Sequence, residues 1–134
     1  MALSLAVNRT IITEKVLGAG QIPALTFVPP VKAYEGIQPE WAQINQEERE
    51  VLASDFYSKA GYSDSNPLKI EIIYNTSENH KRVALAVASM WKTVLGVETT
   101  LRNQEWKVFL ETRRLQNETQ IFRGGWIGDY DDPY

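Results

Sequence analysis

The 134-residue sequence contains no cysteine, which excludes disulfide bonds, thiolate catalysis and cysteine-ligated zinc. It also lacks an excess of positive charge, because 17 Asp and Glu outweigh 14 Lys and Arg for a net charge of −3. We therefore expect no nucleic acid and no anionic membrane as a partner. Long apolar runs are missing too. The longest candidate, residues 83–91, falls far short of the roughly 20 residues of a membrane span, so we expect a buried helix there.

The composition is otherwise that of an ordinary globular protein, with 43% apolar and 23% charged residues and the length of one domain. The opening residues lack the order of basic, apolar and small residues that marks a signal peptide. No closing secondary-structure element is predicted after the Gly- and Trp-rich stretch near residue 126. We therefore expect residues 1–134 to be one part of a longer protein.

Two helices are predicted in the first half of the chain, separated by an irregular connection. The first covers residues 9–17, with Asn8 as its N-cap and Gly18 as its stop. The second covers residues 46–60, with Leu52 and Phe56 on one face. Residues 18–44 between them hold seven glycines and prolines. These residues disfavour helix interiors and the hydrogen-bonded pairing of strands, so they predict a long irregular connection.

The second half, residues 66–129, predicts an α/β region with a mostly parallel βαβαβ core. Strands are expected at residues 68–74, 97–101 and 119–122, and the first of these runs alternates apolar and polar residues over its first half and is rich in β-branched ones. Helices are expected between them, from residue 76 or 77 to 95 and from 104 to 115. The first of these helices has a buried face predicted from helical spacing, formed by Val83, Val87, Met90, Trp91 and Val94. Short joints between alternating elements favour parallel strands joined by right-handed crossovers.

Ligands of open α/β sheets usually bind beyond the carboxyl ends of the strands. Three predicted loops occupy that position, at residues 75–80, 103–106 and 123–130. In the third loop Arg123 and Asp129 lie six residues apart, which would suit the two charged ends of a zwitterion, and Trp126 offers flat apolar surface. The alternative is an internal Arg–Asp bridge with Trp126 in the core, as in a structural interaction domain. The spacing alone favours the internal bridge.

Other candidate sites have weaker support. His80 is the one histidine and follows a predicted helix start, where a histidine is commonly solvated or part of a cap. Trp106 is as typical of a core as of a site. Ser77 and His80 lie three residues apart, but no nucleophile elbow accompanies them. The aspartates near the end lack the spacing of a calcium loop. We therefore expect no enzyme activity, no resident metal and no cofactor.

Several motifs, in order, closely resemble the family of periplasmic oligopeptide-binding proteins, the substrate-binding components of peptide ABC transporters. They are residues 74–81 (YNTSENHK), 88–92 (ASMWK), 95–97 (LGV), 103–107 (NQEWK) and 125–130 (GWIGDY), together with 2–9 (ALSLAVNR), 22–24 (IPA) and 28–30 (VPP). The likeness spans essentially the whole chain. It implies a periplasmic receptor with the type II periplasmic-binding-protein fold, to which residues 1–134 contribute part of the C-terminal lobe.

The resemblance also implies ligands, partners and residue roles. The two lobes would close on a short extended peptide that is bound through its main chain, and the loaded receptor would meet a membrane permease. Asp129 would pair with the peptide ammonium, and Arg123, Arg113 and His80 would receive the terminal carboxylate of peptides of different lengths. Trp106 and Trp126 would line side-chain pockets. The alternatives are a receptor of the same fold for murein tripeptide, a nickel chelate or haem, and a small α/β hydrolase that uses Ser77 and His80.

Overall fold

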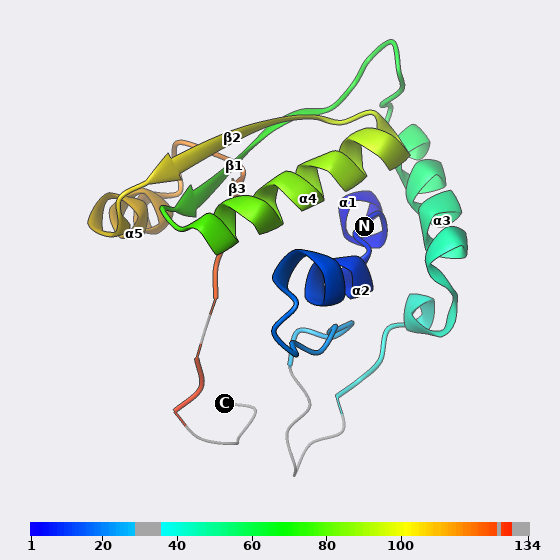
Figure 1. Cartoon of the computed structure of the whole chain (residues 1–134). Coiled ribbons are helices and arrows are strands. Elements are labelled where there is room, and N and C mark those ends of the chain that lie inside the picture. Colours follow the sequence, from blue (N-terminus) through cyan, green and yellow to red (C-terminus); the bar gives the residue numbers. More distant parts are fainter. Residues whose placement is uncertain (29–35, 126, 130–134) are drawn as a thin grey trace.

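The computed structural model describes residues 1–28, 36–125 and 127–129, and these residues form an α/β structure (Figure 1). The elements follow in the order α1 (Ala2–Leu5), α2 (Arg9–Ile11), η1 (Ile12–Leu17), η2 (Glu40–Gln43), α3 (Gln46–Lys59), β1 (Lys69–Asn75), α4 (Glu78–Leu95), β2 (Glu98–Gln104), α5 (Trp106–Leu115) and β3 (Ile121–Phe122). Among the described residues no helix is long and apolar enough to cross a membrane.

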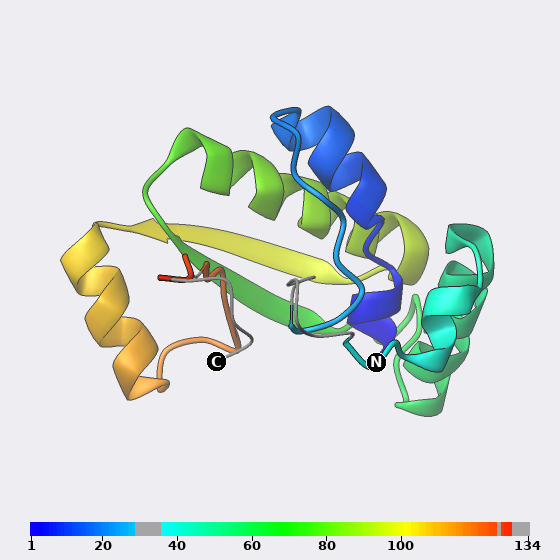
Figure 2. The same cartoon turned by 90° about the horizontal axis from the view of Figure 1, so that it is seen from below.

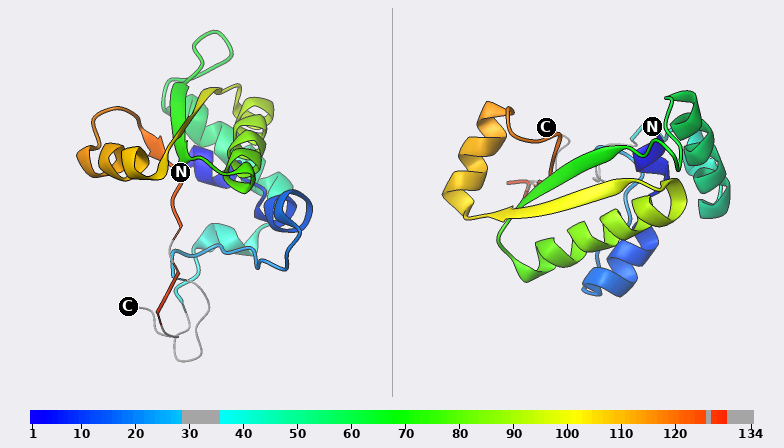
Figure 3. Two further views of the ribbon diagram at one scale, coloured as in Figure 1. Left: turned by 60° about the vertical axis from the view of Figure 1, so that its left-hand side comes forward. Right: turned by 90° about the horizontal axis from the view of Figure 1, so that it is seen from above.

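The sheet has three strands in the order β2-β1-β3, and both pairings are parallel. In the central strand, Ile72 pairs with Leu101 of β2 and with Ile121 of β3. The predicted parallel βαβαβ core is therefore confirmed. The two crossovers run in opposite directions across the sheet, and right-handed crossovers of that kind place their helices on opposite faces. Figures 2 and 3 show this arrangement, with α4 covering one face and α5 the other.

Most of the core lies on the α4 side of the sheet, where α1 and α3 also pack. Leu5 and Ala53 are fully buried there, beneath Trp91 of α4. The Trp91 Nε1–H donates to the carbonyl oxygen of Leu3 at 2.8 Å, so the buried indole N–H has a hydrogen-bond acceptor. On the α5 side, Phe109 and Ile73 are almost completely buried.

Local sequence signals set the helix ends, and those at Asn8, Gly18 and Gly96 were predicted. The Asn8 side chain accepts a hydrogen bond from the backbone N–H of Ile11, and Gly18 ends the following π-helical turns in the left-handed conformation with φ +64°. The α3 helix begins at a capping box between Asn45 and Glu48. Gly96 ends α4 with φ +73°.

The structure corrects several details of the expected elements. Leu52 and Phe56 share a face of α3 as expected, but Phe56 is 37% exposed, and the buried residues of the helix are Ala53 and Tyr57. The β2 strand continues to Gln104, three residues beyond the predicted end, and β3 contains only two of the four residues expected. The irregular connection is confirmed for residues 18–28 and 36–44 apart from the η2 turn, and residues 29–35 lie outside the described residues.

Candidate functional site

All three parallel strands end at the same edge of the sheet, and a hollow of about 500 Å³ lies there. It is lined by Asn75, His80, Trp106, Phe109, Arg113, Arg123, Gly124, Gly125 and Ile127. Each of the three predicted loops contributes to this lining, so their expected convergence is confirmed. The second loop is shorter than predicted, because Asn103 and Gln104 belong to β2.

One wall of the hollow is aromatic and is built by α5. Trp106, in the first turn, stacks on Phe109 with ring centroids 6.0 Å apart, and Phe109 meets the edge of Phe122 at 6.4 Å. Phe109 is 1% exposed and anchors the helix to the sheet, whereas Trp106 is 51% exposed. Trp106 therefore presents an apolar face to a ligand from a rigid support.

Two arginines bring positive charge to the same hollow. The Arg113 guanidinium carbon lies 5.8 Å from the centre of the Phe109 ring, one helical turn along α5. Arg123 follows β3, and its backbone N–H donates to the carbonyl oxygen of Ile73 at 2.8 Å. Burial lowers the pKa of Arg123 from its ordinary value, because a charged guanidinium loses hydration there.

Glycines let the chain pass close to both guanidinium groups. A methyl group placed on Gly125 would lie 3.3 Å from Nη1 of Arg123, and one placed on Gly124 would lie 3.8 Å from Nη1 of Arg113. Within the described part of the chain, neither guanidinium donates a hydrogen bond or forms an ion pair, and the lining contains no carboxylate. Two sets of donors suited to carboxylate therefore face one hollow without a partner among the described residues.

His80 lies in the first turn of α4 and is half-buried at the rim of the hollow. Its Nδ1 lies 3.2 Å from the carbonyl oxygen of Asn75. Because a carbonyl oxygen only accepts, Nδ1 carries the hydrogen in this contact, which leaves Nε2 as the ring nitrogen for a ligand.

Four predicted site residues thus line the hollow, namely His80, Trp106, Arg113 and Arg123. The other two, Asp129 and Trp126, do not appear in its described lining. Asp129 is exposed and is not part of the lining, and the described residues show no ion pair between it and Arg123. The alternative of an internal Arg123–Asp129 bridge is thus not supported. Trp126 lies outside the described residues, so its predicted place in a side-chain pocket stays a prediction.

The chemistry of the hollow is that of binding. Across residues 1–28, 36–125 and 127–129, no group of three or more His, Asp or Glu side chains is placed to hold a metal ion. The charged groups that line the hollow are cationic, and the wall beside them is aromatic. Such a site can hold an anionic group and an apolar side chain of the same small ligand.

Sequence reasoning missed Phe109 as part of the site. Its signal was helical spacing, because it lies three residues after Trp106 and four before Arg113, on one face of α5. The polar network around Arg102 was also missed, since it depends on the pairing of strands and not on any local pattern.

Comparisons with known proteins point the same way. The family described as bacterial extracellular solute-binding proteins, family 5 Middle, matches residues 1–134. The periplasmic murein peptide-binding protein MppA of Escherichia coli (strain K12) is 47% identical over 136 residues, covering 99% of this chain and 25% of that protein. The periplasmic oligopeptide-binding protein OppA of Salmonella typhimurium is 43% identical over 133 residues, covering 98% and 24%.

A solved structure gives the same likeness in three dimensions. The crystal structure of Haemophilus influenzae OppA in complex with the peptide RPPGFSPFR matches with a TM-score of 0.89 and 41% identity, covering 98% of this chain and 26% of that one. The chain therefore spans about a quarter of the length of the curated relatives that it matches.

Proposed function

Because the chain belongs to family 5 of the bacterial extracellular solute-binding proteins, we propose that it forms part of the ligand-binding lobe of a peptide receptor. The receptor would be a protein of the relatives' length, with this chain in the C-terminal of its two lobes. It would bind short peptides in the periplasm and deliver them to the membrane permease of an ABC transporter. The relatives are named periplasmic peptide-binding proteins, which supports both the ligand and the compartment.

The observation that carries the proposal is the pair of guanidinium groups at the strand ends. Arg113 and Arg123 face one hollow beside the aromatic wall, with no carboxylate in the described lining. A guanidinium binds a carboxylate through two parallel hydrogen bonds, and every unmodified peptide ends in a carboxylate. Partial burial strengthens this pairing, since the competing hydration of Arg123 is already reduced.

The residues would divide the peptide between them. Arg123 and Arg113 would receive the terminal carboxylate of peptides of different lengths, as would the imidazolium form of His80, whose Nδ1–H already donates to Asn75. Trp106 and Trp126 would contact side chains. Asp129 would pair with the peptide ammonium. Asp129 is exposed in this chain, which leaves its carboxylate accessible to a ligand or to an opposing lobe. Recognition of the main chain and the two charged ends explains a broad choice of sequences, because all peptides share those groups.

Other ligands are possible within the same fold. Murein tripeptide is itself a short peptide and would use the same carboxylate contacts, and the likeness to the murein peptide-binding protein MppA favours it. A nickel chelate or haem would not need a free ammonium. The hydrolase alternative is not supported, because the chain belongs to a family of solute-binding proteins.

The proposal is tested by isothermal titration calorimetry on the full-length receptor, by which we mean a protein of the relatives' length that carries this chain. Tri-, tetra- and pentaalanine are each titrated as the free peptide, the N-acetylated peptide and the C-terminal amide. We expect the free peptides to bind, with losses of about 100-fold or more when either charged end is removed, since an unpaired buried charge costs about 3–5 kcal/mol.

Two outcomes would contradict the proposal in different ways. Binding that survives N-acetylation would remove the ammonium role of Asp129. An absence of binding for every peptide would leave the fold in place but assign the receptor to another ligand class, which haem and nickel chelates would then test.

A further inference from the structure

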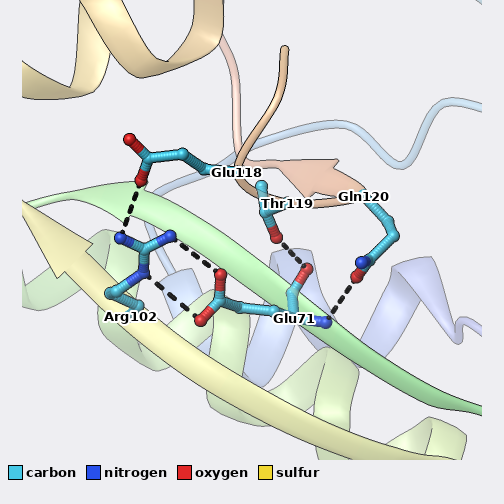
Figure 4. A network of polar contacts seen from close by, with 5 residues as sticks. All are labelled: Glu71, Arg102, Glu118, Thr119 and Gln120. Atoms are coloured by element: carbon cyan, nitrogen blue, oxygen red, sulfur yellow. Dashed lines mark hydrogen bonds and ion pairs between the residues drawn. The ribbon is translucent and has the colours of Figure 1, made fainter.

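A polar network holds the segment that leads into β3, and it lies outside the hollow. Figure 4 shows its five residues, Glu71, Arg102, Glu118, Thr119 and Gln120, which we call the Arg102 network. Arg102 donates to both carboxylate oxygens of Glu71, at 3.0 and 3.3 Å, and to Glu118 at 3.0 Å. These hydrogen bonds raise the pKa of Arg102, and the bond to Glu71 has the largest effect.

The network also includes the backbone of the central strand. The Thr119 hydroxyl donates to the carbonyl oxygen of Glu71 at 3.0 Å, and the Glu71 backbone N–H donates to Oε1 of Gln120 at 3.0 Å. Glu71 is therefore held through both its side chain and its backbone. Since the sheet order is β2-β1-β3, the Arg102 guanidinium reaches from β2 across β1 to the residues that precede β3.

The short length of β3 makes this connection important. The strand pairs with β1 at only two positions, and the next backbone hydrogen bond is that of Arg123 to Ile73. A two-residue pairing is weak by itself, because few backbone bonds offset the entropy of ordering the segment. The Arg102 network adds bonds just before the strand, and Arg123 is the first residue after it.

We propose that Arg102 is a positioning residue for ligand binding: through Glu71 and Glu118 it holds the segment that places the Arg123 guanidinium at the hollow. This inference rests on the proposed function for the identity of the ligand, a peptide carboxylate. An ordinary surface ion pair would contribute little and would act on one element only. Arg102 instead joins three segments, with side chains 38% exposed for Arg102 and 25% for Glu71.

The test compares Arg102→Met, which keeps the apolar stem, with Glu118→Gln, which keeps an acceptor but removes the charge. The control is Arg114→Met, because Arg114 pairs with Glu111 within α5 and lies outside the network. The first measurement is backbone hydrogen exchange at Ile121 and Arg123, whose N–H groups face β1 in the parallel register. We expect about tenfold faster exchange at these two amides in Arg102→Met, a smaller change in Glu118→Gln, and no change in the control.

The second measurement is the ratio of the affinities of the full-length receptor for tetraalanine and for its C-terminal amide. A purely structural loss would weaken both ligands equally. Loss of positioning would reduce the preference for the free carboxylate by about tenfold, and Arg102→Met would have no further effect on that preference when Arg123 is already methionine.

The outcomes separate this inference from the proposed function. Unchanged exchange at Ile121 and Arg123 would overturn the positioning role. Faster exchange with an unchanged preference for the free carboxylate would overturn it as well. If the unmodified protein binds no peptide, the proposed function fails, and the exchange measurement alone decides whether Arg102 holds the Arg123 segment.

Discussion

Two pairs of arginines lie beside hollows in this molecule, and they differ in what their guanidinium groups bond to. Arg9 and Arg49 flank Trp41, with guanidinium carbons 5.2 and 5.6 Å from its ring centre, and they help to line a hollow of about 330 Å³. Arg113 and Arg123 line the larger hollow at the strand ends. Both pairs combine positive charge with an aromatic ring, so residue type alone does not distinguish them.

The donors of the first pair are used inside the fold. Arg9 donates to the carbonyl oxygens of Ser4 and Val7, both at 3.1 Å, and to the Ser4 hydroxyl at 2.9 Å. Arg49 donates to the carbonyl oxygens of Trp41 and Ala42 at 3.0 and 3.1 Å. Burial, and then the nearby charge of Arg49, lowers the pKa of Arg9. This pair joins the N-terminal helices to the η2 turn.

The donors of the second pair have no such role within the described residues. Arg123 also has a pKa lowered by burial, but its guanidinium makes no hydrogen bond to the part of the chain that the structure describes. The comparison teaches that an arginine whose donors are taken up by backbone carbonyls stabilises the fold. An arginine that is desolvated with its donors free is available to a ligand.

The substitution with the largest expected effect on this comparison is Arg123→Met in the full-length receptor. We expect the affinity for a free-carboxylate peptide to fall about 100-fold, the equivalent of about 3 kcal/mol, because the ligand carboxylate loses its partner. The free energy of unfolding should change by less than about 0.5 kcal/mol. Calorimetric titration and urea unfolding measure the two quantities, and near-native affinity would contradict the ligand role of Arg123.

The converse substitution is Arg9→Met, which should act on stability alone. Losing the bonds to Ser4 and Val7 leaves carbonyl groups without their donor, so we expect the free energy of unfolding to fall by about 2 kcal/mol. Peptide affinity should stay unchanged. Urea unfolding beside the Arg114→Met control measures the effect, and a stable protein with weakened peptide binding would reverse the assignment of the two pairs.

A smaller substitution sharpens the comparison at the second pair. In Gly125→Ala the new methyl group would lie 3.3 Å from Arg123 Nη1 and displace the guanidinium by a few tenths of an ångström. We expect about a fivefold loss of affinity, the equivalent of about 1 kcal/mol. Gly124→Ala is the matched control, because its methyl group would make an ordinary 3.8 Å contact with Arg113. Equal effects of the two substitutions would contradict this geometry.

The sequence predicted those parts of the fold that depend on local signals. The caps at Asn8, Gly18 and Gly96 were correct because a cap is decided within a few residues of the chain. The parallel βαβαβ order followed from alternating periodicities. The buried residues of α3, Ala53 and Tyr57, were not predicted, because a small residue such as Ala53 is not conspicuous in a hydrophobic pattern.

The candidate site was predicted in part, and the limit has a physical cause. Arg123, Trp106 and His80 stand directly at the predicted strand ends, so topology brings them together. Arg113 lies well inside α5, and its role came only from the family resemblance. The Arg102 network could not be predicted, because it depends on the register that pairs Arg102 with Ile73 and brings Glu118 close from 16 residues away.

The hydrogen bond from Trp91 to Leu3 has a consequence for the order in which the chain can fold. The two residues are 88 positions apart, and α1 finds its other partners in α3. A ribosome that adds about 5–20 residues per second needs roughly 4–18 s to make the stretch between them. Until then the apolar side chain of Leu5 has no α4 to cover it, so the nascent chain exposes this surface for that time.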